Sequence, residues 1–396
     1  MEKAEQVRVI RGLMHFLDTD TNVDAGCQVR NPVSSYTSAA MAKDEWHHFF
    51  RTAPQVVGLS GDLPDAGSFF TTRDFGKPVL CTRDKQGKFH AFLNVCRHRG
   101  TLLEDDERGR RNVFTCPFHA WGYSNQGDLV AVPKEEHFGP VDRSCHSLVP
   151  LPSEERYGLL WVHPETGADL DVDACLGELA PELASWELER FRFSGNTTYE
   201  HPMNWKLAVD TFGETYHFNV LHRETLANDV YGNVQMYDTY ERNHRMMLCL
   251  RNIDALRELP EDDWEILQAS IPVYYLFPNV QLILGVGGPT LVRIYPHGED
   301  PHHSYSRISF YLDPDIESLA MDPARRERYE QVQERMQGFA SVIEQEDYTA
   351  AASSHLGIVS GAQEYLVFGR NEPALHHYHN TYRAALGLPP LDVISN

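Results

Sequence analysis

The sequence contains Cys96-Arg-His98 and, after seventeen intervening residues, Cys116-Pro-Phe-His119. Each of these short stretches offers one thiolate and one imidazole, both of which can bind metals. Turn-forming residues accompany them, since Gly100 follows the first stretch and Pro117 lies inside the second. Such residues favour tight loops. We therefore expect two loops that bind one inorganic centre together.

The order of the ligands distinguishes two kinds of centre. Structural zinc sites usually take two cysteines from one loop and two histidines from another, whereas each loop here supplies one of each. Two Cys and two His that hold a [2Fe–2S] cluster form a Rieske centre, whose histidines raise the reduction potential above that of all-cysteine clusters. We predict such an electron relay, with zinc as the alternative. Its ligands would be Cys96, His98, Cys116 and His119.

Composition and charge indicate a large globular protein. A chain of 396 residues is longer than one core usually supports, and its formal charge of −22 argues against nucleic acid or an anionic membrane as partner. No apolar run approaches the roughly 20 residues that span a bilayer, and the charged start does not read as a signal peptide. The seven cysteines are scattered rather than arranged as a disulfide framework, so we expect a cytoplasmic protein.

The distribution of apolar and turn-forming residues along the sequence suggests the domain organisation. Residues 46–164 contain short apolar stretches separated by Gly, Pro, Asp and Asn, which is typical of antiparallel strands. From residue 165 onward, longer segments of strand and helix character alternate. We therefore predict an α+β protein. A small antiparallel β domain (46–164) would precede a larger α+β domain (165–396) with an antiparallel sheet flanked by helices, and residues 1–45 would pack on the larger domain.

A second motif lies in the predicted larger domain, where Asn204-Trp-Lys is followed by Glu214-Thr-Tyr-His217-Phe-Asn-Val-Leu-His222. Two histidines five residues apart would point roughly 140° apart on one continuous helix. A helix that ends near Asn219 would let them converge. Two His and one carboxylate on one face of a metal are the ligands of non-haem Fe(II) oxygenases.

The carboxylate can be sought in the pattern of a C-terminal helix. Asp322-Pro323 reads as a helix N-cap followed by a first-turn proline. Four residues beyond the last member of a predicted buried stripe lies Asp347, and a carboxylate on a buried face needs an ion partner or a metal. Glu346 is the rival but lies further from the centre of the stripe. The stripe comprises Tyr329, Val332, Met336, Ala340 and Ile343.

Both motifs, in this order, resemble those of the Rieske non-haem iron oxygenases, the aromatic-ring-hydroxylating dioxygenase family, and of their large or alpha terminal subunit. The resemblance implies a mononuclear Fe(II) bound by His217, His222 and Asp347. Glu346-Asp347 is similar to the usual acidic pair of that family.

Glu214 has a predicted role of its own. It lies three residues before His217, and a neighbouring carboxylate commonly orients a metal-bound histidine. The resemblance implies that Glu214 also carries electrons from the partner subunit's His119 to His217 in a head-to-tail homotrimer, with or without a small beta subunit. Asp210 is a rival on the same face, and we interpret it as structural.

The source of electrons must lie outside the chain. Gly285-Val-Gly-Gly-Pro-Thr290 lacks the last glycine of a dinucleotide-binding fingerprint and leads into proline rather than a helix. We therefore expect a turn there. The resemblance implies that a separate reductase, with or without a ferredoxin, delivers electrons from NAD(P)H.

The substrate class is predicted from the residues between the two ligand stretches. Residues between the two ligand stretches favour an apolar, aromatic compound, which would be mono- or cis-dihydroxylated with O₂ as co-substrate. One alternative is a monooxygenase that demethylates or hydroxylates a quaternary ammonium or N- or O-methyl compound. The alternative class is a Rieske electron carrier without catalysis. The apolar residues are Leu226, Val230, Met236, Met246, Met247, Leu248, Leu282 and Leu284.

Overall fold

The chain, described here by a computed structural model over residues 1–320 and 326–394, forms two compact units. The larger unit comprises Met1–His48, Leu176–Trp186 and Ser194–Asn396, and the smaller comprises Phe49–Cys175 and Glu187–Phe193. The domain boundaries that we predicted after residues 45 and 164 stay a proposal. None of the described helices combines the length and the apolar character needed to cross a membrane.

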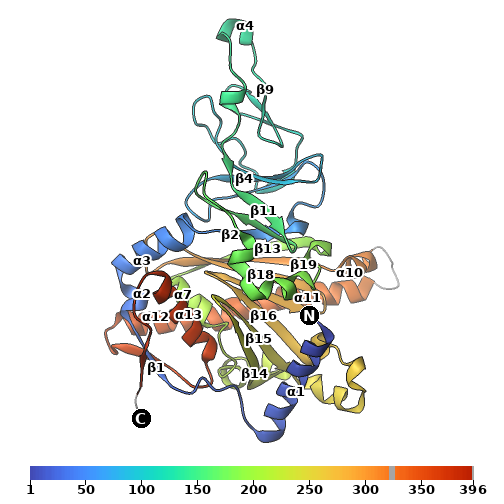
Figure 1. Cartoon of the computed structure of the whole chain (residues 1–396), viewed down its shortest axis with the longest axis vertical. Helices are drawn as coiled ribbons and strands as arrows, with labels where there is room; N and C mark the ends of the chain where they lie inside the picture. Colours follow the sequence, from blue (N-terminus) through green and yellow to red (C-terminus); the bar gives the residue numbers. More distant parts are fainter. Residues whose placement is uncertain (321–325, 395–396) are drawn as a thin grey trace. The chain divides into compact units, whose positions relative to one another are not determined.

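The smaller unit consists of short antiparallel strands in three sheets (Figure 1). The strands of the five-stranded sheet follow the order β10 (Pro150–Leu151), β5 (Phe89–Leu93), β4 (Val79–Arg83), β3 (Ser68–Thr72) and β6 (Arg108–Arg110). One three-stranded sheet contains β11 (Ser153–Arg156), β12 (Leu159–Val162) and β2 (Gln55–Leu59). The other contains β7 (Val113–Thr115), β8 (Gly122–Ser124) and β9 (Leu129–Ala131).

The core of the smaller unit includes residues of both predicted metal-binding loops. Cys96 and Cys116 are almost fully buried and belong to the same apolar cluster as Trp121 and Tyr123. Gly100, which follows the first loop, has a φ of +78°, a conformation that glycine adopts without strain. The loops are therefore anchored in a packed core rather than held on a flexible surface.

The larger unit is built on a seven-stranded sheet (Figure 1). Its strand order is β13 (Arg192–His201), β19 (Ser304–Leu312), β18 (Gly288–Pro296), β17 (Val280–Gly285), β16 (Ser270–Leu276), β15 (Asn243–Leu250) and β14 (Val230–Tyr240). A small sheet joins β20 (Tyr365–Phe368), β1 (Val29–Pro32) and β21 (Asp392–Val393). Because helices accompany antiparallel sheets, the predicted α+β class is confirmed.

Each face of the seven-stranded sheet packs against different helices. Met247 and Cys249 of β15 share an apolar core with α1 (Lys3–Thr19). Side chains alternate along a strand, so His244 points to the opposite face, where it contacts Tyr378 of α13 (Pro373–Ala385) with ring centroids 4.7 Å apart. The alternation thus separates an apolar face under α1 from an aromatic, polar face under α13.

This alternation corrects our prediction for part of the apolar pocket lining. Met236 packs against Gly12 of α1, and Met247 belongs to the core with α1. Leu282 and Leu284 alternate with Gln281, whose side-chain amide donates to Tyr378 on the α13 face. These four side chains therefore point away from that face, while Met246 and Leu248 share the α13 face with His244.

The C-terminal helices supply the predicted carboxylate. Helix α11 (Arg326–Val342) passes into a π-helical turn, η9 (Ile343–Tyr348), which leads directly into α12 (Thr349–Val359). The predicted stripe is the less exposed side of this segment, and Ala340, Ile343 and Asp347 are buried. The predicted helix start at Asp322-Pro323 lies outside the described residues.

Candidate metal centres

The two histidines of the second motif lie at opposite ends of one very short helix. Asn204 caps the N-terminus of helix α7 (Trp205–Asp210), because its side-chain oxygen accepts from the Lys206 amide at 3.0 Å. This helix ends at Asp210, and the four-residue helix α8 (Phe218–Leu221) follows. His217 and His222 occupy the positions just before and just after α8. The predicted helix end near Asn219 is wrong, but the predicted convergence of the histidines is observed.

Helix α7 is fixed by a buried ion pair. The Lys206 ammonium lies 2.6 Å from the Glu45 carboxylate, and both side chains are 2% exposed. The indole nitrogen of Trp205 donates to the same carboxylate at 3.0 Å. Glu45 ends α3 (Ala39–Glu45), so the Asn204-Trp-Lys motif ties α7 to that helix.

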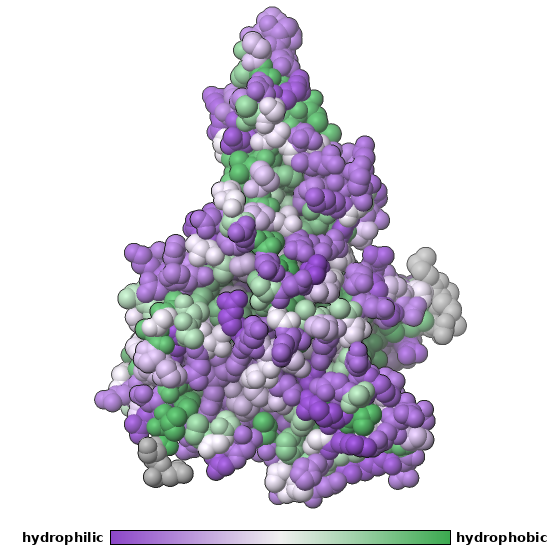
Figure 2. Space-filling view, in the orientation of Figure 1, coloured by the Kyte–Doolittle hydropathy of each residue, from purple (hydrophilic) through white to green (hydrophobic). Residues whose placement is uncertain are grey.

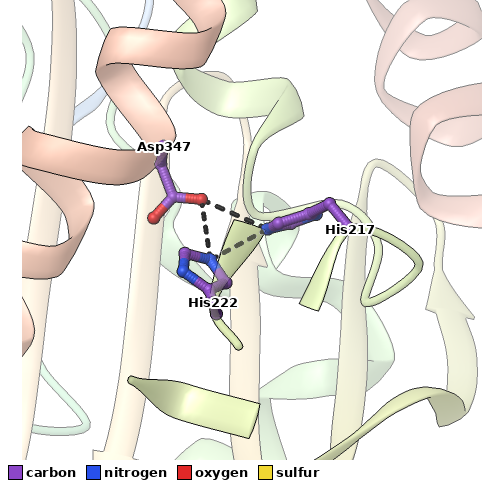
Figure 3. A group of neighbouring side chains, drawn as sticks. All are labelled: His217, His222 and Asp347. Atoms are coloured by element: carbon purple, nitrogen blue, oxygen red, sulfur yellow. Dashed lines mark hydrogen bonds and ion pairs between the residues drawn. The ribbon is translucent and has the colours of Figure 1, made fainter. Parts of the chain in front are cut away.

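Asp347 completes a compact triangle with the two histidines (Figure 3). The Nε2 atoms of His217 and His222 are 3.1 Å apart, and the Asp347 Oδ1 lies 3.2 Å from each of them. Three ligands at right angles around one ion, each about 2.1 Å from it, would be about 3.0 Å apart. The donor set and its spacing therefore fit one face of a six-coordinate metal and leave the opposite positions open.

The charges of the triangle also fit a cation. Burial opposes protonation of His217, but its contacts with Asp347 and Glu214 prevail and raise its pKa to about 9. Burial likewise opposes ionisation of Asp347, whereas the two histidines lower its pKa. Without a metal, the imidazoles and carboxylates of the triangle would share protons. Metal binding would displace them, because a ligating imidazole is unprotonated.

Each histidine has a second carboxylate on its other ring nitrogen. The Nδ1 of His217 contacts the Glu214 carboxylate, which also accepts from the His217 amide at 3.1 Å. The Nδ1 of His222 lies 2.7 Å from the Glu346 carboxylate. Such partners fix the tautomer and direction of a ligating imidazole. The contact of Glu346 was missed from the sequence, because the stripe argument considered it only as a rival ligand.

Asp210 belongs to a different network. Its carboxylate accepts from the Tyr36 hydroxyl at 2.6 Å and contacts the His379 Nε2 at 2.9 Å. Asn31 contacts both of these partners. These bonds join α7, α13 and the N-terminal segment, in agreement with the structural role that we assigned to Asp210.

The two loops of the smaller unit present their ligands in different surroundings. The Cys96 and Cys116 side chains are adjacent, and burial together with the Cys116 thiol raises the pKa of Cys96. The rings of His98 and His119 have centroids 4.7 Å apart. The buried Nδ1 of His98 has no hydrogen-bond partner in the part of the chain that the structure describes. A buried nitrogen without a partner is suited to bind a metal.

The loops pair thiol with thiol and imidazole with imidazole. Across residues 1–320 and 326–394, the ligand atoms that converge within 4.8 Å of one another belong to His217, His222 and Asp347. Two thiolates and two imidazoles around a two-iron core remain compatible with the arrangement.

A pocket of about 380 Å³ opens beside α8 in the larger unit. Asn219 of α8 lines it together with polar residues from the end of α1 and the start of β14, among them Asp20, Asn22 and Asn233. The apolar residues that we predicted to line a substrate pocket do not contribute to it. Phe16, Leu17 and Val234 also line it, so its walls are mixed, with polar and apolar side chains together.

Two family models match the chain. A model described as the ring hydroxylating alpha subunit (catalytic domain) matches residues 188–388, and the Rieske [2Fe–2S] domain matches residues 53–150. This chain belongs to the ring-hydroxylating alpha-subunit family. The predicted family and the pair of iron cofactors that characterises it are thereby confirmed.

Several curated relatives of this alpha subunit are named as carnitine or glycine betaine monooxygenases. The carnitine monooxygenase oxygenase subunit of Acinetobacter baumannii is 31% identical over 193 residues, which are 48% of this chain and 52% of the relative. The glycine betaine monooxygenase oxygenase subunit of Chromohalobacter salexigens is 29% identical over 49% of this chain and 43% of its own. The chain thus spans about half the length of the curated relatives it matches.

Solved structures of Rieske oxygenases share the fold of this alpha subunit. A quaternary ammonium Rieske monooxygenase in complex with L-carnitine has a TM-score of 0.69 at 20% identity and covers 91% of this chain and 96% of its own. Naphthalene 1,2-dioxygenase from Rhodococcus sp. has a TM-score of 0.67 at 18% identity and covers 97% and 99%. At these identities the likeness shows the fold and does not distinguish the substrates.

Proposed function

We propose that this protein is the terminal oxygenase of a Rieske non-haem iron system and acts as a monooxygenase on a quaternary ammonium or N-methyl compound. The observation that carries the reaction type is the triangle of His217, His222 and Asp347, whose donor atoms lie 3.1–3.2 Å apart. An electron carrier without catalysis would not need this second site.

Each candidate ligand, and each carboxylate beside a histidine, has a definite task in the proposal. His217, His222 and Asp347 hold the mononuclear iron, while Cys96, Cys116, His98 and His119 hold the cluster. When bound, the iron supplies a site for O₂ activation and the cluster supplies single electrons. Glu214 and Glu346 keep the two imidazoles in the tautomer that leaves Nε2 free for the metal.

The proposed substrate class replaces our expectation of an apolar aromatic compound. The named relatives act on carnitine, glycine betaine and choline, as their names state. The α13 face of the sheet supports a substrate with a quaternary ammonium group. The aromatic rings of Tyr237 and His244 lie on this face, with centroids 5.2 Å apart. Aromatic faces attract quaternary ammonium groups.

Buried polar atoms on the same face add to this support. The Gln235 Nε2, the Tyr237 hydroxyl and the Gln281 Oε1 are buried and lack hydrogen-bond partners within the described ranges. Gln235 also accepts from Thr215, two residues before His217, at 3.0 Å. A bound polar molecule or water would satisfy atoms that an apolar hydrocarbon would leave unpaired.

Partners and assembly remain part of the proposal. Electrons would come from NAD(P)H through a separate reductase, with or without a ferredoxin. Following the family resemblance, Glu214 would connect His217 to the partner subunit's His119 in a homotrimer. The cytoplasmic location stays a prediction from the scattered cysteines.

A substrate screen with the reconstituted protein tests this function. The holoprotein, a ferredoxin–reductase pair, NADPH and ¹⁸O₂ would be combined with carnitine, glycine betaine, choline or naphthalene. We expect one labelled oxygen atom in the product of a quaternary ammonium compound, with the second atom released as water by two electrons and two protons. Formation of a labelled cis-diol from naphthalene alone would contradict the substrate class. Zinc without iron or labile sulfide would contradict the whole proposal.

A further inference from the structure

Two aromatic rings enclose His98 in the smaller unit. The His98 ring stacks on Trp121 with centroids 4.9 Å apart and planes 9° apart. Phe138 meets the same imidazole edge to face, at 5.3 Å and 82°. Trp121 and Phe138 also contact each other at 5.7 Å. Together they form an aromatic cover over this imidazole.

Phe138 reaches His98 from a separate part of the chain. It ends the short helix α4 (Glu135–Phe138), which follows the left-handed residue Lys134. An ion pair between Arg143 and Glu135 at 2.6 Å joins the two ends of the segment that contains Phe138. Beyond it, the His146 ring contacts the Trp121 ring, with centroids 5.7 Å apart. Residues 134–146 thus fold back over Trp121, although Phe138 itself is 53% exposed.

The second histidine contacts one aromatic ring and a cation. The Arg99 guanidinium donates to the His119 Nε2 at 2.8 Å and lies over the Phe118 ring at 4.2 Å. Phe118 contacts His119 but is itself 55% exposed. The two histidines therefore differ, since His98 contacts two rings, Trp121 and Phe138, whereas His119 contacts Phe118 and a guanidinium. Figure 2 shows hydrophobic and hydrophilic side chains together on the part of the smaller unit that carries α4.

We propose that Phe138 is a positioning residue that lowers the reduction potential of the cluster by keeping water away from His98. This inference rests on the proposed assignment of His98 as a cluster ligand. Two thiolates and two neutral imidazoles leave the oxidised [2Fe–2S] cluster without net charge, and uptake of one electron makes it an anion. Apolar surroundings disfavour the charged form of a group. The aromatic cover therefore disfavours the reduced cluster.

The test is a redox titration of the holoprotein, followed by the EPR signal of the reduced cluster. Replacing Phe138→Ala should raise the midpoint potential, because water can then stabilise the anionic reduced form. We expect the equilibrium constant for reduction to increase by up to about tenfold, which is about 59 mV for one electron. In D₂O, deuterium couplings to the cluster should also become stronger.

Two further variants make the result decisive. Val130→Ala is the matched control, since Val130 is an exposed apolar residue of β9 in the same unit, and its midpoint potential should equal that of the unaltered protein. Phe138→Leu keeps apolar cover and should give a smaller rise. If Phe138→Ala fails to hold the cluster, Phe138→Leu decides, with a rise above the control supporting the proposal.

The contrary outcomes are equally specific. An unchanged or lowered midpoint potential in Phe138 variants that keep their iron and labile sulfide would overturn the role of the aromatic cover. Absence of any [2Fe–2S] cluster from the unaltered protein would instead overturn the proposed function. The two failures are therefore distinguishable in the same preparation.

Discussion

The Glu346 carboxylate lies 2.7 Å from the Nδ1 of His222, although Glu346 directly precedes Asp347 in the sequence. The π-helical turn at residues 343–348 brings both adjacent carboxylates to the same histidine, one on each ring nitrogen. Turns of this kind occur frequently at functional sites. The acidic pair therefore divides into one residue that could bind a metal and one that orients a ligand.

Replacing Glu346→Gln should weaken iron binding without abolishing it. The amide no longer provides the charge that favours the Nδ1–H tautomer of His222, and loss of such a partner typically reduces metal affinity about 10–100-fold. Competition with a chelator measures the change. Glu344→Gln is the matched control, because Glu344 lies exposed in the same turn. Equal iron affinity in both variants would show that Glu346 does not orient His222.

Replacing Asp347→Ala should remove the mononuclear iron and all turnover while the visible spectrum of the cluster persists. The substitution takes away one of the three donors that converge at 3.1–3.2 Å, whereas the cluster loops belong to the smaller unit. Metal analysis and the spectrum together check this. Normal iron content in Asp347→Ala would refute the assignment. Glu344→Ala, rather than Glu346→Ala, is the suitable control.

The candidate ligands could be picked out from the sequence because their signals are local or periodic. Cys96 and His98 lie in one loop, so their spacing alone indicates a shared centre. Asp347 was found because the buried stripe continues through Ala340 and Ile343 to its position. The partner role of Glu346 depends on the π-helical turn, which the stripe argument did not include.

The break between α7 and α8 depends on contacts that are distant in sequence. A Cβ atom at Gly213 would lie 2.8 Å from the Tyr378 ring of α13, so the chain here must have a glycine to approach that helix. Part of the pocket prediction needed correction for a similar reason. Met236 and Met247 are apolar, but only the position of α1 decides which face of the sheet they join.

Replacing Lys206→Met should strongly destabilise the protein. The substitution leaves the Glu45 carboxylate buried without its cation, and breaking a buried pair in this way typically lowers the free energy of unfolding by about 3–5 kcal/mol. Urea denaturation measures the change. The double variant Lys206→Met/Glu45→Gln should recover part of it, whereas Lys43→Met, at an exposed position of α3, should change stability by less than about 0.5 kcal/mol. A small loss in Lys206→Met would contradict the importance of this pair.

Stability should fall as the pH decreases from about 6.5 to about 4. Burial lowers the pKa of His201 to about 4, whereas the unfolded chain takes up this proton near pH 6.5. The unfolded state therefore binds more protons across this window, and the contribution of His201, up to about 3 kcal/mol, is lost toward the acid side. His201→Gln should flatten the profile measured by urea denaturation. His15→Gln, at an exposed position, should leave it unchanged, and an unaltered slope in His201→Gln would contradict this account.

Replacing Glu214→Gln should leave a cluster that can be reduced but should suppress product formation. The amide keeps the size of the side chain and can still accept from the His217 amide, but it removes the negative charge next to the His217 Nδ1. Iron binding at His217 should weaken, as expected at His222 in Glu346→Gln, so the variant is assayed with excess Fe(II), and dithionite should still reduce the cluster. If Glu214 couples the two centres, the reduced cluster signal should persist when substrate and O₂ are added, and product formation should fall by orders of magnitude. Glu224→Gln, whose carboxylate is 85% exposed, serves as the control. Near-normal reoxidation in Glu214→Gln would mean that electrons reach His217 without this carboxylate.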